Sequence, residues 1–202
     1  LETAVSYFPS GAVMLTGNPI RRSISTVKRS LGNYEKFGLD PDLKTVFVMG
    51  GSQGATAINS LIIDALEYLE CHNQNFQLIH QTGEQDLQVV MNKYDESSVK
   101  SLIKPYFDRI EEIYSIVDLM VCRSGGMTVS EITACGIPSI FIPLPSAVGN
   151  DQLANAKMIA SKGAGIVLDQ FKIDGKTLAN YIIDIVTDPA RLGSMSKASH
   201  RL

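Results

Sequence analysis

The sequence predicts an α/β fold, a Rossmann-like parallel sheet with helices on both faces. Six short apolar runs, several of them rich in β-branched residues, alternate with segments in which apolar residues recur at helical spacing. Two of these runs lead into glycine-rich turns that stand directly before a helical segment. Strands and helices that alternate in this way are typical of a sheet whose neighbouring strands are parallel.

The predicted strands are bounded by turn-forming residues. The first is a β-branched run that ends at Gly50, the third stops before Pro105, and the fifth lies between Pro138 and Pro143. The six predicted strands are Thr45–Met49, Phe76–His80, Val99–Ile103, Asp118–Cys122, Ser139–Ile142 and Gly165–Leu168.

The predicted helices occupy the segments between these strands. Gly136 and Gly163 follow two of them as stop signals, and the Asp174 carboxylate can cap the last one by accepting free amide hydrogens of its first turn. The polar stretch Ser30–Lys44 is expected to be a long loop within one domain. The predicted helices are about Gln53–Glu70, Leu87–Tyr94, Arg109–Val117, Thr128–Cys135, Asp151–Lys162 and Asp174–Val186.

Composition narrows the class of protein. The 202 residues are 45% apolar and 19% charged, enough for a sizeable core and unlike a disordered or coiled-coil chain. The net charge of −3 gives no general attraction for nucleic acid, no apolar run reaches the roughly 18 residues of a membrane span, and no signal peptide is evident. Three cysteines without a C-x-x-C pair indicate neither a disulfide framework nor a zinc site. We expect a single globular domain, residues 1–202, in the cytosol.

The first strand runs into the glycine-rich turn Gly50–Gly54 directly before a helix. Glycine lets a backbone approach a bulky anion, and the free amides of a helix N-terminus carry partial positive charge, so phosphate or pyrophosphate binding is one interpretation. The other is a turn needed only for tight packing. The pattern is neither G-x-G-x-x-G nor a P-loop, which disfavours a dinucleotide or nucleoside triphosphate site.

A second junction of this kind, Arg123–Glu131, follows the fourth strand. Thr128 and Glu131 are three residues apart, the spacing of a capping box, which is one interpretation of Glu131. The other is a carboxylate that accepts hydrogen bonds from the hydroxyls of a ribose. Two phosphate-ready helix starts in one sheet favour a ligand site.

Two further segments are candidates. After the fifth strand, the loop Pro143–Asn150 leads into a helix start whose amide and carboxylate groups can read sugar hydroxyls, or whose Asn150 or Asp151 can serve only as an N-cap. Residues 17–30 hold four basic side chains and no acidic one, and the turn Gly17–Pro19 can fix Arg21, whose guanidinium suits a diphosphate.

Other arrangements of reactive residues are rejected. His80 is expected to be a structural hydrogen-bond partner, and no pair of histidines has metal-ligand spacing. The D-x-D pattern Asp40–Asp42 precedes a strand, which is the wrong end for a ligand.

Five motifs in order resemble one family. They are G-N-P-I-R at 17–21, G-G-S-Q-G-A at 50–55, H-Q-T-G at 80–83, C-R-S-G-G-M-T-V-S-E at 122–131 and Q-x-x-N-A at 152–156. Over nearly the whole chain this series resembles the C-terminal, donor-binding half of the MurG family, peptidoglycan N-acetylglucosaminyltransferases that convert lipid I to lipid II. The resemblance implies a GT-B fold of two Rossmann-like domains, with UDP-N-acetylglucosamine held mainly by the C-terminal one.

The resemblance also implies a role for each matching position. Arg21 and Ser52, with the neighbouring Gln53 and Gly54, are expected at the donor site, the first two on the diphosphate. The Phe107 backbone is expected to recognise uracil, and Met127 and Thr128 to lie near the phosphate and ribose. Glu131 is expected to take the ribose hydroxyls and Gln152 the sugar.

The mechanism that the resemblance implies needs no metal or other cofactor. An acceptor hydroxyl displaces UDP with inversion at the sugar carbon, while amides, hydroxyls and a helix dipole stabilise the leaving group. The proposed base, and the surface for lipid I at the cytoplasmic face of the membrane, belong to an N-terminal domain that we expect to be absent here, as is a final C-terminal helix. The family often has histidine where this chain has Asp151, and alanine where it has Gly126.

Three alternatives remain at this point. One is a UDP-sugar-binding module or subunit without catalysis, and another is a UDP-sugar 2-epimerase, which shares the GT-B fold but demands acidic and histidine groups that this chain offers sparsely. A Rossmann dehydrogenase or methyltransferase is disfavoured because G-x-G-x-x-G is missing.

Overall fold

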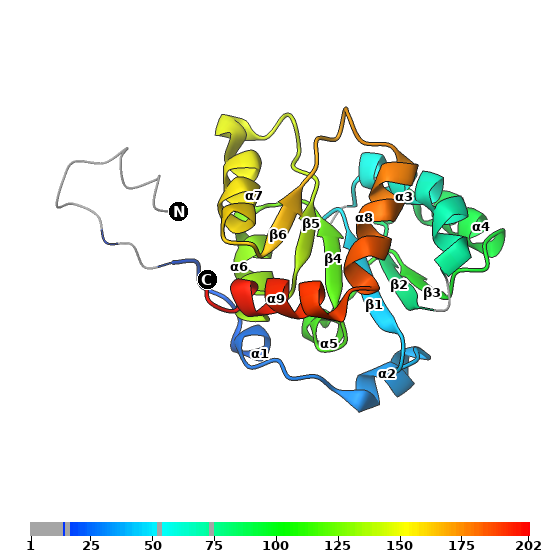
Figure 1. Ribbon diagram of the computed structural model, residues 1–202, viewed down its shortest axis with the longest axis horizontal. Helices are drawn as coiled ribbons and strands as arrows, with labels where there is room; N and C mark the ends of the chain where they lie inside the picture. The colour runs from blue at the N-terminus through cyan, green and yellow to red at the C-terminus, as the bar shows by residue number, and fades with distance from the viewer. Residues whose placement is uncertain (1–13, 15–16, 52–53, 73–74) are drawn as a thin grey trace.

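A computed structural model describes residues 14, 17–51, 54–72 and 75–202, and these form a six-stranded parallel sheet between two layers of helices (Figure 1). The strands stand in the order β3-β2-β1-β4-β5-β6. This confirms the predicted fold class. The strands are β1 Lys44–Met49, β2 Phe76–Gln81, β3 Ser101–Lys104, β4 Leu119–Cys122, β5 Ser139–Phe141 and β6 Gly165–Val167.

The helices connect these strands and extend the chain at either end. The α-helices are α1 Arg22–Ser25, α2 Leu31–Phe37, α3 Thr56–Leu69, α4 Leu87–Asp95, α5 Ile110–Tyr114, α6 Gly126–Ala134, α7 Asp151–Ser161, α8 Gly175–Val186 and α9 Pro189–Ser199. In the described part of the chain, the 3-10 helix η2 Glu70–His72 follows α3, and the 3-10 helix η3 Val148–Asn150 precedes α7.

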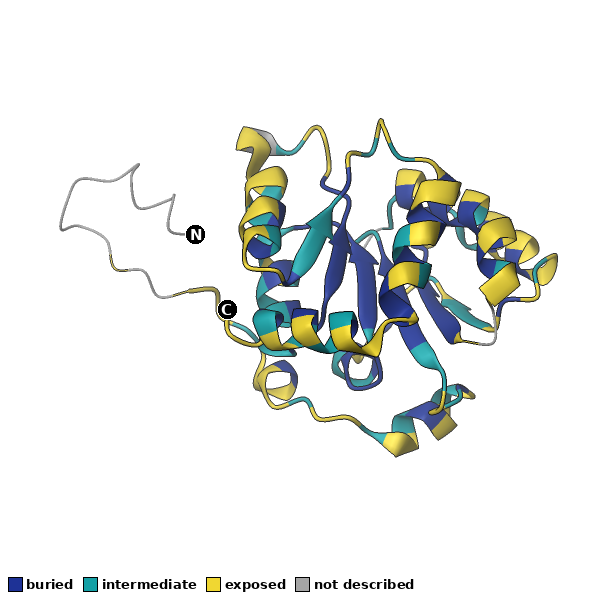
Figure 2. Ribbon diagram, viewed as in Figure 1, coloured by how far each residue is buried: buried dark blue, intermediate teal, exposed yellow. Residues whose placement is uncertain are grey.

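Alternation along the strands divides the core into two layers. In β1, Val46 and Val48 pack with α3, α4 and α8 on one face, whereas Phe47 and Met49 pack with α5, α6 and α7 on the other. Both sets of strand side chains are buried, while the outer faces of the helices are exposed (Figure 2). A parallel sheet covered in this way requires apolar residues on both faces of its strands, which explains the continuous apolar runs.

Several segments differ from the prediction, among them α1, which was not predicted, and the three that follow. The stretch expected as a loop, Ser30–Lys44, contains α2, because Tyr34 is buried and its hydroxyl donates a hydrogen bond to the Ile116 carbonyl. Helix α9 was not predicted, although Asp188 caps it and Pro189 occupies its first position. The third strand begins at Ser101 rather than Val99, which is buried in the core but lies outside the ladder.

The sheet changes direction between β1 and β4. From β1 the chain builds outward through β2 and β3, and then returns to the other side of β1 and builds outward through β4, β5 and β6. The last residues of the two central strands, Met49 and Cys122, pair in register, so the loops that follow begin side by side. No helix in the described part of the chain is long and apolar enough to cross a bilayer.

Candidate functional site

Two helices begin beside the carboxyl ends of β1 and β4. Helix α3 starts after the loop that leaves β1, and α6 starts after the loop that leaves β4. In open parallel sheets, ligands bind outside the carboxyl ends of the strands at such a switch point. The sequence-predicted glycine turn and the Arg123–Glu131 junction therefore meet at one edge of the sheet.

Glycine is required in the turn after β1 by close backbone approach. A Cβ on Gly54 would lie 2.1 Å from the Thr82 carbonyl oxygen, and one on Gly50 would lie 2.4 Å from the Ala55 Cβ. Gly54 also has a φ of 82°, in the left-handed region. Packing thus accounts for these two glycines, as one interpretation of the turn held. Ser52 and Gln53, expected in the same turn, lie outside the described residues.

The amide groups at the start of α3 and α6 are not satisfied by side-chain caps. Ala55 and Gly125 are the N-cap residues, neither gives a side-chain hydrogen bond, and neither helix has an acidic residue in its first turn. Among the described α-helices, only α8 and α9 have a side-chain cap, from Asp174 and Asp188. The Asp174 cap confirms a prediction. The uncapped pair at the switch point leaves amide hydrogens and positive dipole ends for an anion.

The capping-box interpretation of Glu131 is wrong. Thr128 is the third residue of α6 and not its N-cap, so the spacing of three has no capping geometry here. Instead, the half-buried Glu131 accepts a hydrogen bond on Oε2 from the Tyr114 hydroxyl at 3.1 Å. Burial and the Glu131 charge raise the pKa of Tyr114 well above its ordinary value, which keeps this phenol a donor. Among the described residues, Glu131 Oε1 accepts no hydrogen bond.

Met127 and Thr128 lie in the first turn of α6, beside the uncapped amides. The Met127 side chain is exposed and that of Thr128 is half-buried. They stand one turn before Glu131 on the same helix. The structure therefore places these three predicted residues within the first two turns of one helix.

The G-N-P turn near the start of the chain reaches the same helix through Asn18. Its Nδ2 donates to the Gly126 carbonyl at 3.2 Å and to Ser130 Oγ at 2.9 Å. Arg21, three residues later, is the N-cap of α1 and is exposed. The described contacts tie Asn18 rather than the Arg21 guanidinium to the site.

Gln152 holds the loop after β5. Its Oε1 accepts from the Leu144 amide at 2.9 Å, and its carbonyl accepts from Ser124 Oγ at 2.7 Å. The side-chain Nδ2 of Asn155 donates to the Ser124 carbonyl. The start of α7 is thereby fastened to the β4–α6 junction, although Asn150 makes no side-chain cap. Gln152 Nε2 donates to none of the described residues.

Phe107 is placed on the loop that follows β3, at the far side of β2 from the glycine turn. Its backbone amide donates to Gln81 Oε1 at 3.1 Å, and its ring is buried against Phe37 and Phe47. The neighbouring Tyr106 is half exposed. Because the Phe107 amide is engaged, a ligand can address this backbone through the carbonyl oxygen.

Two residues that organise the site were not assigned from the sequence, although both stand inside the quoted motifs. Gln81 is buried at the end of β2 and donates to the Gly51 carbonyl. Arg123 is buried at the end of β4, where its guanidinium donates to the carbonyls of Ile142 and Pro143 and to Gln170 Oε1. Burial lowers the pKa of Arg123. The sequence signal that could have found both is a polar residue at the end of an otherwise apolar strand.

His80 is a structural residue, as the sequence predicted. The imidazole is buried between Asn59 Oδ1, at 3.0 Å from Nε2, and the Tyr94 hydroxyl, at 3.2 Å from Nδ1. Burial lowers the pKa of His80 to about 3, so the ring is neutral at physiological pH. Within residues 14, 17–51, 54–72 and 75–202, no three His, Cys, Asp or Glu side chains are placed to hold a metal ion.

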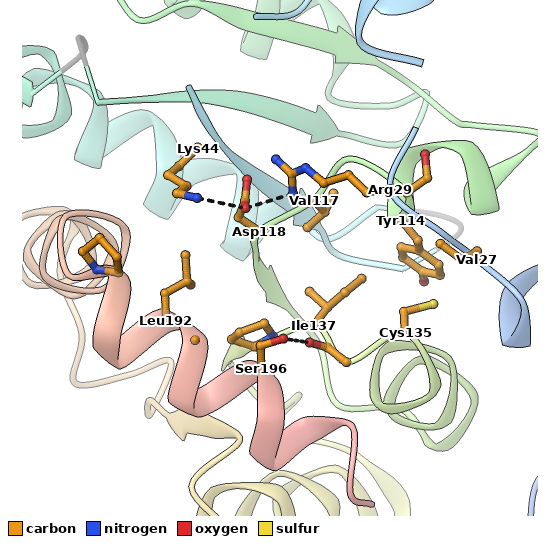
Figure 3. A pocket seen from close by; sticks show the side chains of 15 residues that line it. Val27, Arg29, Lys44, Tyr114, Val117, Asp118, Cys135, Ile137, Leu192 and Ser196 are labelled. Carbon is orange, nitrogen blue, oxygen red and sulfur yellow. Dashed lines mark hydrogen bonds and ion pairs between the residues drawn. The ribbon is translucent and has the colours of Figure 1, made fainter. Parts of the chain in front are cut away.

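The opposite end of the sheet carries a cavity of about 350 Å³ (Figure 3). Asp118, at the start of β4, accepts from Arg29 at 3.1 Å and from Lys44 at 3.4 Å, and Leu192 and Ser196 of α9 form the facing wall. None of the residues predicted for the donor site lines it.

Comparison with known proteins identifies the family of the chain. Residues 45–202 match the family of the glycosyltransferase family 28 C-terminal domain. The chain is 39% identical over 208 residues to UDP-N-acetylglucosamine–N-acetylmuramyl-(pentapeptide) pyrophosphoryl-undecaprenol N-acetylglucosamine transferase of Geobacter metallireducens, and 38% identical over 202 residues to that of Geobacter sulfurreducens. Each match covers 100% of this chain and 55% of the relative, so the chain spans about half the length of these relatives.

A solved structure shows the same fold. The crystal structure of Acinetobacter baumannii MurG is 26% identical and superimposes with a TM-score of 0.72, over 91% of this chain and 53% of that protein.

Proposed function

The chain belongs to the family of glycosyltransferase family 28 C-terminal domains, and from this we propose that it binds UDP-N-acetylglucosamine as the sugar donor of a peptidoglycan N-acetylglucosaminyltransferase. The observation that carries the proposal is the pair of uncapped helix N-termini, α3 and α6, on either side of the switch point between β1 and β4. A diphosphate placed there meets free amides from both helices. The curated relatives are named for this donor sugar.

The diphosphate is assigned to the glycine turn and the start of α6. Gly54, together with Ser52 and Gln53, contributes the turn, and Met127 and Thr128 border the phosphate and ribose from the first turn of α6. Arg21 is proposed to add its guanidinium. Two observations support this role: the Arg21 side chain is exposed, and Asn18 of the same segment contacts α6. A bound diphosphate would be the ion-pair partner of the guanidinium.

The ribose is assigned to Glu131 on α6, and the base is assigned to the backbone of Phe107 on the loop after β3. Glu131 keeps one carboxylate oxygen on Tyr114 and offers the other to the ribose hydroxyls. The Phe107 carbonyl offers an acceptor for the N3–H of uracil, since the amide of the same residue is engaged by Gln81. Cytosine has no hydrogen on that nitrogen, so this contact distinguishes the two pyrimidines.

The N-acetylglucosamine moiety is assigned to Gln152. Its Oε1 is fixed by the Leu144 amide, which leaves the Nε2 group to donate to a sugar hydroxyl. Asp151 precedes Gln152 in the first turn of α7, where its negative charge interacts favourably with the helix dipole.

The reaction proposed for the whole protein is a direct displacement. The acceptor hydroxyl of lipid I attacks the anomeric carbon with inversion, the bond to the diphosphate breaks, and UDP leaves with the electron pair. Amides and helix dipoles at the switch point stabilise the developing charge without a metal ion. The general base, the lipid I contact and peripheral attachment to the cytoplasmic face of the membrane are assigned to a second domain, in keeping with the share of the relatives that this chain spans.

Calorimetric titration of this chain tests the proposal. UDP, UDP-N-acetylglucosamine, UDP-glucose and NAD are titrated separately with EDTA present. We expect saturable binding of UDP and of UDP-N-acetylglucosamine, weaker binding of UDP-glucose, and no heat from NAD. A folded chain that binds none of the UDP ligands contradicts the proposal.

A further inference from the structure

Gln81 occupies a position from which one side chain can reach two ligand-binding loops. It is the last residue of β2, which lies between β1 and β3, and it pairs in register with Met49 on one side and Lys104 on the other. The strand β1 continues into the glycine turn and β3 continues toward Tyr106 and Phe107. The end of β2 therefore separates the loop proposed for the diphosphate from the loop proposed for the base.

The Gln81 amide is bonded to both loops. Its Nε2 donates to the Gly51 carbonyl at 3.1 Å, and its Oε1 accepts from the Phe107 amide, also at 3.1 Å. The residue is 1% exposed, so water does not compete for these bonds. A primary amide is planar, and its donor and acceptor hold a fixed relation to each other. The side chain thus sets the spacing between the two loops.

The rest of the end of β2 strengthens this link. The Thr82 amide donates to the Lys104 carbonyl and the Gly83 amide to the Pro105 carbonyl, so the ladder with the β3 segment continues past the strand. On the other side, Gly54 approaches the Thr82 carbonyl so closely that no side chain fits between them.

We propose that Gln81 is a positioning residue that fixes the distance between the glycine turn and the Tyr106–Phe107 loop, so that a single nucleoside diphosphate engages both. This inference rests on the proposed function. A ligand that spans both loops binds more tightly when their distance is already set, because its binding does not have to order the loops. A ligand that touches one loop does not depend on that distance.

The test compares Gln81→Met with Gln77→Met. Gln77 lies at the other end of the same strand and is also buried, where its amide accepts from the Asp40 amide and donates to the Asp40 carbonyl and to Thr45 Oγ1. Both variants lose a buried bridging amide of the same size. Only the first loses it between the proposed ligand loops.

Calorimetry measures the affinity of each variant for UDP, uridine and pyrophosphate, after circular dichroism shows that it is folded. We expect Gln81→Met to weaken UDP binding at least tenfold while its affinities for uridine and for pyrophosphate stay within about twofold of the parent chain. Gln77→Met is expected to lower the unfolding midpoint but to keep all three affinities.

Two results overturn the inference: unchanged UDP affinity in folded Gln81→Met, or equal losses for all three ligands. If Gln81→Met does not fold, Gln81→Asn takes its place, since its amide is retained on a stem too short to reach both loops. Parent-like UDP affinity in Gln81→Asn then overturns the inference. If the parent chain itself fails to bind UDP, the proposed function is wrong, a result separate from any effect of Gln81.

Discussion

The two ends of the central strands differ in how their polar groups are satisfied. At the amino end, the Asp118 carboxylate is 8% exposed and accepts hydrogen bonds from Arg29, Lys44 and the Thr45 amide. At the carboxyl end, α3 and α6 begin without side-chain caps, and one oxygen of Glu131 has no described donor. The buried Asp118 carboxylate thus finds its donors within the chain, whereas the first amides of α3 and α6 and one Glu131 oxygen have no side-chain partner among the described residues.

The helix starts at the switch point lack one source of stability. Uncapped helix starts and close-packed glycines stabilise a folded chain less than caps and side-chain contacts do, by about 1 kcal/mol for each missing cap. The same chain caps α8 and α9 with aspartate. Helices α1, α2, α4, α5 and α7 also begin without a side-chain cap, so what distinguishes α3 and α6 is that both begin beside the switch point between β1 and β4.

The largest effect is expected for Gly54→Ala, compared with Gly38→Ala. Both glycines have positive φ, but a Cβ meets the Thr82 carbonyl oxygen at 2.1 Å in the first and nothing within 4 Å in the second. We expect Gly54→Ala to cost about 4 kcal/mol of unfolding free energy and to abolish UDP binding, and Gly38→Ala to cost about 1 kcal/mol and leave binding intact. Urea denaturation and calorimetry measure both. Equal costs would show that close approach is not the reason for Gly54.

Glu131→Ala is expected to weaken UDP binding by about 1.5–3 kcal/mol, the range for a lost hydrogen bond to a charged group. Tyr114→Phe is the control, because it removes only the hydroxyl group that donates to the Glu131 carboxylate. Calorimetry on the phenylalanine variant should give a UDP affinity within about threefold of the parent chain. If both variants lose affinity alike, Glu131 acts through Tyr114 and not on ribose.

Acidification tests the buried network beneath the glycine turn. The pKa of His80 is about 3 in the folded chain, against about 6.5 when unfolded, so the unfolded state takes up the proton first. Stability that is fully present above pH 6.5 is therefore lost as the pH falls toward 3, by about 2 kcal/mol between pH 6.5 and 5. Urea midpoints at the two pH values measure this loss. His80→Gln should show a smaller pH dependence, and an unchanged one would assign the loss to other groups.

Asp118→Asn is expected to have the smallest effect and to act on stability alone. Arg29 is 49% exposed and Lys44 37%, so solvent screens both ion pairs and the loss should be about 1 kcal/mol in a urea titration. UDP affinity should not change. A fall in UDP affinity would mean that the amino end contributes to binding.

The order of strands and helices was predictable because it depends on local patterns. Continuous apolar runs mark strands buried on both faces, and helical spacing marks the segments between them. The prediction failed where tertiary contacts decide. Helix α2 forms because Tyr34 is buried in the core and its hydroxyl donates to the Ile116 carbonyl. The spacing of apolar residues within α2 does not predict these contacts.

The sequence predicted which strand–helix junctions form the candidate site, but not which side chains contact one another there. Two glycine-rich turns at strand ends identified the edge, and the resemblance supplied roles for individual residues. The partners of Glu131 and Phe107 were not predictable, because Tyr114 and Gln81 come from elements distant in the sequence. Arg21 shows the remaining gap, since the residue that contacts α6 from its segment is Asn18.

The most direct test of the account is a titration of the isotopically labelled chain with UDP, followed through the amide resonances. The account predicts saturable shifts at Gly51, Gly54, Gly125 and Met127, around the switch point, and none at Gly136, Gly193 or Ser196 around the amino-end cavity. Shifts confined to the cavity, or no saturable shifts in the folded chain, would contradict the assignment of the donor site to the carboxyl ends of β1 and β4.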